Sequence, residues 1–467
     1  MFYAFLRRLA RIALRWYYRD VEVIGADRVP ADAPLLVVAN HPNAMIDPML
    51  VATTLSRRVT FTGKATLFEN LFLRAFLGSV GMVPLRRASD ERARRQAGGA
   101  PDPRRNEDAF RAVIDALAHR RAVLIFPEGK SHDEPSIAPL KTGTARMALQ
   151  ARAAGVRELV VLPIGFVFED KSRPRTRILV EVGEPLALDG WPGADTADAV
   201  DQLTAEIDRR IRAVTTNYET AAAAAEVAQL TTLLAGESFR PLGMGTRWAE
   251  LVAVGRRIDA ARHLLARAAA AGGEATARAD ALRARARNLE EAAAREQLDL
   301  LDATIDTSVG SGAKFVVREG AIAMLAAPFA LLGRIVHWPA LAIARAVARR
   351  RSESGSDPAM QTIVVGAPLV LATWALIATL SWRAAGPLGG LAALVLLPLL
   401  ADCDFALRDR AARARARVRA YRRFRREPSL QKAFVAGISA ARNEAAELER
   451  SLVDDRQGAG GAGGEAA

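Results

Sequence analysis

Cysteine is almost absent from this chain of 467 residues, and aromatic residues make up only 6% of it. The single cysteine, Cys403, excludes both an intrachain disulfide and a zinc site built from cysteines, so nothing in the sequence points to an oxidising compartment. We expect no cleavable signal peptide, because arginines interrupt the apolar N-terminal stretch before an uninterrupted apolar core of a signal can form.

Acidic residues are outnumbered by basic ones, which gives the chain a formal net charge of +13 and predicts an anionic partner. Membrane lipid and nucleic acid are the two obvious classes of anionic partner. The arginines cluster beside apolar runs, and no aromatic-rich surface accompanies them that could read bases. The pattern therefore favours anionic lipid headgroups and argues against nucleic acid.

The N-terminal segment has the periodicity of an amphipathic helix over residues 2–19. Apolar and aromatic residues recur at helical spacing, and the other face carries Arg7, Arg8, Arg11 and Arg15. A basic face beside aromatic anchors is typical of a helix that lies in the membrane interface, and we assign residues 1–19 to such a helix. Packing of this helix on its own domain is the compatible alternative.

Residues 20–216 alternate between short apolar runs and helix-like stretches, which predicts an α/β domain with a largely parallel sheet and flanking helices. The expected strands are Leu35–Ala39, Val59–Thr62, Met82–Leu85, Ala122–Phe126, Leu159–Phe166 and Ile178–Val182. The expected helices are 43–56, 66–77, 106–119, 141–154 and 196–216.

The character of the sequence changes after residue 216. Residues 217–312 are rich in Ala, Arg and Glu and indicate a solvated helical arm, with a hairpin broken near Gly272 and Gly273. Residues 313–350 are apolar but include Arg334 and two prolines, so we expect a membrane-embedded or interfacial segment.

Two uncharged apolar runs within 361–407 predict a C-terminal transmembrane hairpin, and a basic tail follows over 408–467. Arginines flank both ends of the hairpin, whereas the short connection contains only Arg383. The positive-inside rule then places both ends, and the catalytic domain, on the cytoplasmic side of the membrane, which we take to be a bacterial inner membrane. A buried helical hairpin in a soluble protein is the alternative.

His41 and Asp47 follow directly after the apolar strand 35–39. Side chains at this point emerge at the carboxyl edge of the sheet, where ligands of α/β proteins usually bind. Histidine is the natural general base at neutral pH, and a carboxylate on its second nitrogen fixes its tautomer and stabilises the imidazolium. Pro42 and Asn43 are expected to open the next helix, which places Asp47 in its first turn facing His41.

A second polar segment, Phe126-Pro127-Glu128-Gly129-Lys130-Ser131-His132-Asp133, also leaves a buried strand. Glu128 can bind substrate hydroxyls, and Gly129 permits close backbone approach. The start of the helix 141–154 supplies a cation and backbone N–H groups suited to a phosphate, from Lys141, Thr142 and Gly143. Together the two segments predict activation of a hydroxyl for attack on an acyl thioester.

Further basic residues end neighbouring strands. Arg86 and Arg87 suit a phosphate monoester by bidentate contact, with a solvated basic loop as the alternative. Lys64 is a further phosphate or substrate candidate, and a surface lysine is the alternative for it. His119 is better explained as a helix C-terminal cap, and His132 ranks below His41 as the base.

In combination, these segments resemble the glycerolipid acyltransferase family over the whole of residues 20–215. The blocks occur in the family's order as Asn40–Asp47, Gly81–Arg87, Phe126–Gly143 and Val161–Gly165. The resemblance implies that His41 is the base and Asp47 its partner, with Arg86, Glu128 and Gly129 binding the acceptor. It also implies acyl-CoA or acyl-carrier protein as donor substrate, with no bound cofactor and no metal.

Five residues separate His41 from Asp47, whereas the commonest family pattern has four. The longer spacing and the Ser131-His132-Asp133 sequence resemble the yeast-type glycerol-3-phosphate/dihydroxyacetone-phosphate acyltransferase branch and its bacterial relatives. The leading hypothesis is therefore acylation of glycerol 3-phosphate in phospholipid biosynthesis. A lysophosphatidate or lysophospholipid acyltransferase is the alternative in the same class, and a catalytically dead membrane scaffold is the alternative of another class.

Overall fold

A computed structural model of the chain describes residues 2–85, 107–192, 196–234, 247–269, 274–351 and 357–461. The chain divides into two compact units. The first comprises residues 1–217 with 341–369, and the second comprises 218–340 with 370–467. Each unit is built around cores of its own.

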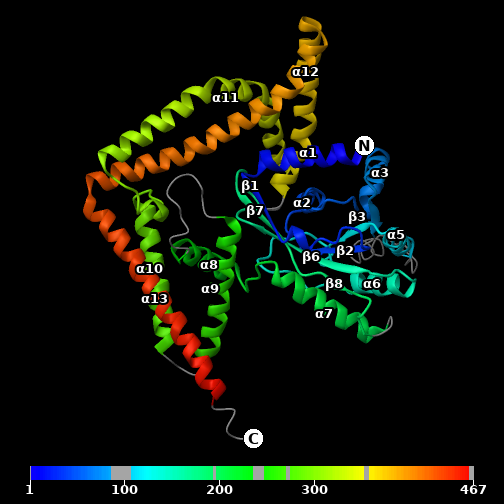
Figure 1. Cartoon of the computed structure of the whole chain (residues 1–467), viewed down its shortest axis with the longest axis horizontal. Coiled ribbons are helices and arrows are strands. Elements are labelled where there is room, and N and C mark those ends of the chain that lie inside the picture. Colours follow the sequence, from blue (N-terminus) through cyan, green and yellow to red (C-terminus); the bar gives the residue numbers. More distant parts are fainter. Residues whose placement is uncertain are drawn as a thin grey trace. The chain divides into compact units, whose positions relative to one another are not determined.

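The first unit contains an eight-stranded sheet in the order β1-β7-β6-β2-β5-β3-β4, with β8 also paired to β6 (Figure 1). All neighbouring strands run parallel except β6, which is antiparallel to β7 and β8. The sheet is thus largely parallel, as predicted. The strands are β1 (Asp20–Ile24), β2 (Leu35–Ala39), β3 (Val59–Lys64), β4 (Val83–Leu85), β5 (Ala122–Ile125), β6 (Val160–Phe168), β7 (Arg177–Val182) and β8 (Leu186–Ala187).

Helices cover both faces of this sheet, so its central strands are apolar at every position. Leu35, Val37 and Ala39 of β2 enter one core, whereas Leu36 and Val38 enter the other. All five are fully buried, because successive side chains of a strand point to opposite faces. The first core lies against α1 (Phe2–Tyr17) and α2 (Ile46–Thr54), and the second against α5 (Glu107–Ala118), α6 (Gly143–Ala153) and α7 (Ala197–Ala213) (Figure 1).

Local hydrogen bonds account for where two of these helices begin, and one of the two begins later than expected. The Thr196 side chain accepts a hydrogen bond from the Ala199 N–H and caps α7. Asn43 does not cap α2, because its side-chain amide donates to the Tyr18 hydroxyl instead. The helix therefore starts at Ile46 rather than at 43, and Pro42 stays outside it. Short elements complete the unit: η1 (Ala26–Arg28), η2 (Ala65–Phe68) and α3 (Leu71–Val80).

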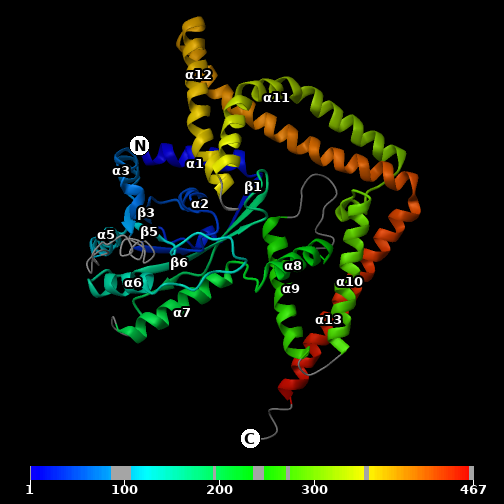
Figure 2. The same ribbon diagram turned by 180° about the vertical axis from the view of Figure 1, so that it is seen from behind.

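The second unit is helical, and its helices share a buried core. Leu230, Leu265 and Leu282 pack in one cluster with Phe424 and Phe434. The helices expected before residue 312 are present, and one face of them is buried, since α10 packs along α13 (Figure 2). The elements of this core are α8 (Ala221–Leu234), α9 (Trp248–Ala269), α10 (Glu274–Arg295), η4 (Leu300–Asp302) and α13 (Pro428–Gly461), with the C-terminal end of α12.

Two helices of the described chain, α11 (Val309–Arg351) and α12 (Asp357–Arg426), are long and apolar enough to cross a membrane. α11 is continuous through Pro328 and Pro339. α12 contains non-helical backbone at Ala385 and Gly386, which lies between the two apolar runs expected to form a hairpin. Asp404 of α12 is buried and pairs with Arg408 on its own helix and with Arg334 of α11, 3.6 Å away.

Candidate active site

The two polar segments predicted from the sequence meet at one edge of the sheet. β2 and β5 are parallel neighbours, with Val38 opposite Ile125. The residues that follow the two strands therefore leave the sheet side by side. The backbone N–H of His41 donates to Glu128 Oε1 at 2.7 Å, which joins the two segments directly.

His41 and Asp47 form a buried hydrogen-bonded pair. His41 Nδ1 lies 2.9 Å from Asp47 Oδ2, and the same oxygen accepts the Asn43 N–H at 2.8 Å. Asp47 is fully buried and His41 is 9% exposed. The His41 ring also stacks on Phe126, with centroids 3.9 Å apart and planes 9° apart. The imidazole is thus held by a hydrogen bond at one edge and by an aromatic ring on one face.

Burial raises the pKa of Asp47 above its usual value, although the hydrogen bond from His41, the Asn43 N–H and the charge of Lys171 act in the opposite direction. A carboxylate with a raised pKa is a better hydrogen-bond acceptor. It holds the Nδ1 proton of His41, which leaves the lone pair on Nε2 available to take a proton. The pair has the arrangement of a base and its orienting carboxylate.

Glu128 makes different contacts from those we expected. Its Oε2 accepts the Ala138 N–H at 2.8 Å and lies within hydrogen-bonding distance of His132 Nε2, while Oε1 accepts from His41. The residue is 3% exposed. Both carboxylate oxygens therefore bind groups of the protein itself. Binding of a substrate hydroxyl by Glu128 stays a prediction, and these contacts argue against it.

Gly129 and the residues before α6 lie close together. Gly129 has φ +75°, a left-handed conformation that favours glycine, and a Cβ there would lie 2.9 Å from Lys141 Nζ. The Lys141 N–H donates to Pro127 O at 2.9 Å. Lys141 is thus packed over the turn, directly before Thr142 and the first residue of α6, Gly143. A cation and a helix N-terminus adjoin the second segment, as the sequence predicted.

The other predicted residues have different outcomes. Lys64 ends β3 at the same carboxyl edge of the sheet, but β5 separates its strand from β2. Arg86 and Arg87 lie outside the described residues. His119 is exposed at the end of α5, with Nδ1 2.8 Å from Asp115 O. It precedes β5, whereas His41 follows the parallel strand β2, so the two histidines lie at opposite edges of the sheet.

The sequence reasoning missed three residues that hold the site. Asn40 makes two hydrogen bonds with the backbone of Phe166 in β6, at 3.0 and 2.8 Å. Tyr18 is fully buried behind Asn43, and burial raises its pKa so that the hydroxyl stays protonated. Lys171 lies in the turn between β6 and β7, and its ammonium donates to Pro42 O in the His41 loop and to His132 O in the second segment. Asn40 adjoins the His41 motif, but no local pattern points to Tyr18 or Lys171.

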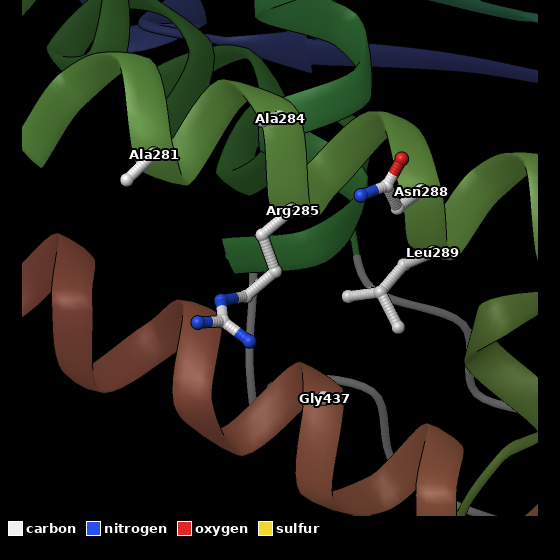
Figure 3. A pocket seen from close by; sticks show the side chains of 6 residues that line it. All are labelled: Ala281, Ala284, Arg285, Asn288, Leu289 and Gly437. Atoms are coloured by element: carbon white, nitrogen blue, oxygen red, sulfur yellow. The ribbon is translucent and has the colours of Figure 1, made fainter.

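A pocket of about 390 Å³ belongs to the second unit, between α10 and α13 (Figure 3). It is lined mainly by small or neutral side chains, and its one charged group, Arg285, is paired with Glu444 at 2.6 Å. Within the described part of the chain, no three His, Cys, Asp or Glu side chains are grouped so that they could hold a metal ion.

The first unit is an α/β domain with a buried His–Asp pair at one edge of its sheet, and comparisons with known proteins show what this domain is similar to. The acyltransferase family model matches residues 20–167. Residues 20–167, which are less than half of the chain, are therefore similar to the acyltransferase family.

Two curated relatives are yeast proteins. Glycerol-3-phosphate O-acyltransferase 2 of Saccharomyces cerevisiae is 38% identical over 117 residues, and glycerol-3-phosphate O-acyltransferase 1 of the same yeast is 33% identical over 121 residues. Each alignment covers 24% of this chain and 16% of the relative. Among solved structures, the 1-acyl-sn-glycerophosphate acyltransferase PlsC of Thermotoga maritima matches with a TM-score of 0.33 and 20% identity, over 45% of this chain and 78% of that one.

These curated relatives contradict one expectation. We predicted a bacterial inner membrane, with the catalytic domain on its cytoplasmic side. The two relatives are yeast enzymes and are not proteins of a bacterial inner membrane, so that prediction is wrong. It depended on the positive-inside rule, which orients a segment in a membrane but does not say which membrane it is.

Proposed function

We propose that this chain is a membrane-bound O-acyltransferase that transfers a fatty acyl group from an acyl thioester to a hydroxyl of glycerol 3-phosphate. The observation that supports it most strongly is the 2.9 Å contact between His41 Nδ1 and Asp47 Oδ2 at the carboxyl end of β2. The acceptor is chosen from the yeast relatives, whose names specify glycerol 3-phosphate. The proposed donor is acyl-CoA or acyl-carrier protein.

The proposed reaction needs one base and no covalent enzyme intermediate, because a thioester is already activated. His41 Nε2 takes the hydroxyl proton as the acceptor oxygen attacks the thioester carbonyl carbon. Asp47 stabilises the imidazolium that forms. The carbon–sulfur bond then breaks, and the imidazolium returns the proton to the departing thiolate. The products are the ester and the free thiol.

The remaining proposed groups serve the acceptor and the membrane. Lys141 and the N-terminus of α6 are suited to the acceptor phosphate, and Lys64, Arg86 and Arg87 remain further candidates. The apolar helices α11 and α12 would anchor the chain, and α1 has the amphipathic pattern of an interfacial helix. The abundant arginines suit anionic headgroups.

A comparison of acceptors tests this function. The full-length protein, purified in detergent, is given one labelled acyl-CoA together with glycerol 3-phosphate, dihydroxyacetone phosphate or lysophosphatidate. We expect labelled product from glycerol 3-phosphate. Product from lysophosphatidate alone would replace the proposed acceptor with a lysolipid. If no acceptor or donor, acyl-carrier protein included, gives product, the enzymatic proposal fails and a membrane scaffold remains.

A further inference from the structure

The loop between His41 and Asp47 has a strained residue at its centre. Ala44 has φ +36°, a positive value that is uncommon for a residue with a Cβ. Its N–H donates to Ser131 Oγ at 3.1 Å. The loop between His41 and Asp47 thus includes a residue with a positive φ, and a side chain from the second segment accepts the N–H of that residue.

Lys171 ties the same loop to the second segment from a third direction. Its ammonium donates to Pro42 O at 3.2 Å and to His132 O at 3.1 Å, and pairs with Asp133 Oδ1 at 2.7 Å. An ammonium has three N–H donors, and these three acceptors account for all of them. Its contacts are therefore those of a bridge between loops rather than of a free cation awaiting a phosphate.

His132 completes the connection through Glu128. His132 Nε2 contacts Glu128 Oε2, and Glu128 Oε1 holds the His41 N–H. The His132 side chain is 11% exposed, and its Nδ1 is buried without a hydrogen-bond partner in the structure. It is therefore poorly placed to exchange protons with a substrate, and well placed to fix Glu128.

We propose that Ser131, His132, Asp133 and Lys171 form a loop clamp, a set of positioning residues that holds the long His41–Asp47 loop in the geometry the reaction needs. The inference rests on the proposed acyltransferase function. It accounts for the joint occurrence of the five-residue spacing and the Ser-His-Asp sequence, because the longer loop needs extra donors and acceptors to hold it. A displacement of the base by about 1 Å can slow a reaction by about 100-fold.

The kinetic test uses the full-length protein with Lys171→Met, which keeps the length of the side chain but removes the ammonium. We expect kcat to fall by about 10- to 100-fold, with the KM of donor and acceptor within about twofold of wild type. Lys171→Arg keeps a charged donor and should restore most of the rate. Arg173→Met removes an exposed cation from the same turn and should leave both constants unchanged.

Two outcomes of the kinetics overturn the clamp. An unchanged kcat in Lys171→Met would show that the loop clamp does not position the base. A large rise in the KM of glycerol 3-phosphate at constant kcat would assign Lys171 to phosphate binding instead. The double variant Lys171→Met with Asp133→Asn should be no slower than Lys171→Met alone, because the two residues act through one ion pair. Additive losses would contradict that shared role.

Hydrogen exchange of the backbone provides a readout that needs no catalysis. In Ser131→Ala, a peptide covering residues 40–47 should exchange faster than in wild type, whereas peptides from α7 should not change. This variant also serves if Lys171→Met does not fold. Faster exchange in a protein without transferase activity would retain the clamp and reject the proposed function. Unchanged exchange, with activity intact, would reject the clamp and retain the function.

Discussion

Asp47→Asn should slow the enzyme while leaving it at least as stable as wild type. Asp47 Oδ2 accepts from both His41 Nδ1 and the Asn43 N–H, and Oδ1 is buried without a partner. The amide oxygen of asparagine can replace Oδ2, because the Asn43 N–H requires an acceptor there, and the amide nitrogen takes the place of Oδ1. The geometry survives and the negative charge is lost.

The size of the effect follows from that charge. Two unit charges about 4 Å apart at an effective dielectric constant of about 20 attract each other by about 4 kcal/mol. The imidazolium that forms as the hydroxyl is deprotonated loses this attraction. Since 1.36 kcal/mol corresponds to a tenfold change in rate, we expect kcat to fall by about 10³-fold.

Unlike kcat, the stability of the folded protein should not fall in Asp47→Asn. Burial raises the pKa of Asp47, so the folded state binds this proton more tightly than the unfolded chain does. Stability therefore falls as pH rises through the folded pKa, and the ionised carboxylate costs stability above it. Asparagine removes this cost at neutral pH. Single-turnover kinetics and thermal melting of the same preparations measure both effects, with Asp201→Asn on the surface of α7 as the control.

A rate within about threefold of wild type in Asp47→Asn would refute the orienting role, because a general base and its partner contribute at least about 100-fold. A lower melting temperature that accounts for the lost activity would also refute it, since the residue would then be structural. Loss of rate with retained stability is the combination that the buried pair predicts.

Three further changes follow from single residues. Gly129→Ala places a Cβ at φ +75° against Lys141 Nζ, so we expect the free energy of unfolding to fall by about 1–2 kcal/mol and the KM of the phosphate acceptor to rise. An unchanged KM would show that Lys141 does not bind the acceptor. Burial raises the pKa of Asp302 to about 6, so wild-type stability should fall as pH rises from about 4 to 6. Asp302→Asn should lose that dependence: it should melt higher than wild type above about pH 6 and no higher below about pH 4, and equal melting of the two proteins above about pH 6 would contradict the shift. Asp404→Ala leaves Arg334 and Arg408 without their shared carboxylate, so detergent-purified protein should melt several degrees lower; no change would mean that the pairs contribute nothing.

The central strands were predictable because they are buried on both faces. β2 has the bounds expected from the sequence, since each residue from Leu35 to Ala39 is apolar and no polar residue blurs its ends. β1 (Asp20–Ile24) was missed, because a half-exposed edge strand mixes acidic and apolar residues and has no continuous apolar run. The two-residue β8 is too short to leave a pattern.

The site was predictable as far as sequence neighbours determine it. His41 and Asp47 lie six positions apart, and the strand before them places both at one edge of the sheet. The start of α2 was not predictable, because the Asn43 side chain donates a hydrogen bond to the Tyr18 hydroxyl and does not cap the helix. Lys171 reaches Pro42 only because β6 packs beside β2, and this pairing over a long sequence separation leaves no local pattern.

The most direct test of the account is acyl transfer to glycerol 3-phosphate by wild type and His41→Ala, purified and assayed side by side in detergent. His119→Ala is the matched control, because its histidine is exposed beyond the end of α5. We predict labelled acylglycerol phosphate from wild type and from His119→Ala, and a kcat at least about 100-fold lower in His41→Ala. A His41→Ala rate close to wild type would contradict the proposed mechanism, and no product from wild type would contradict the proposed reaction.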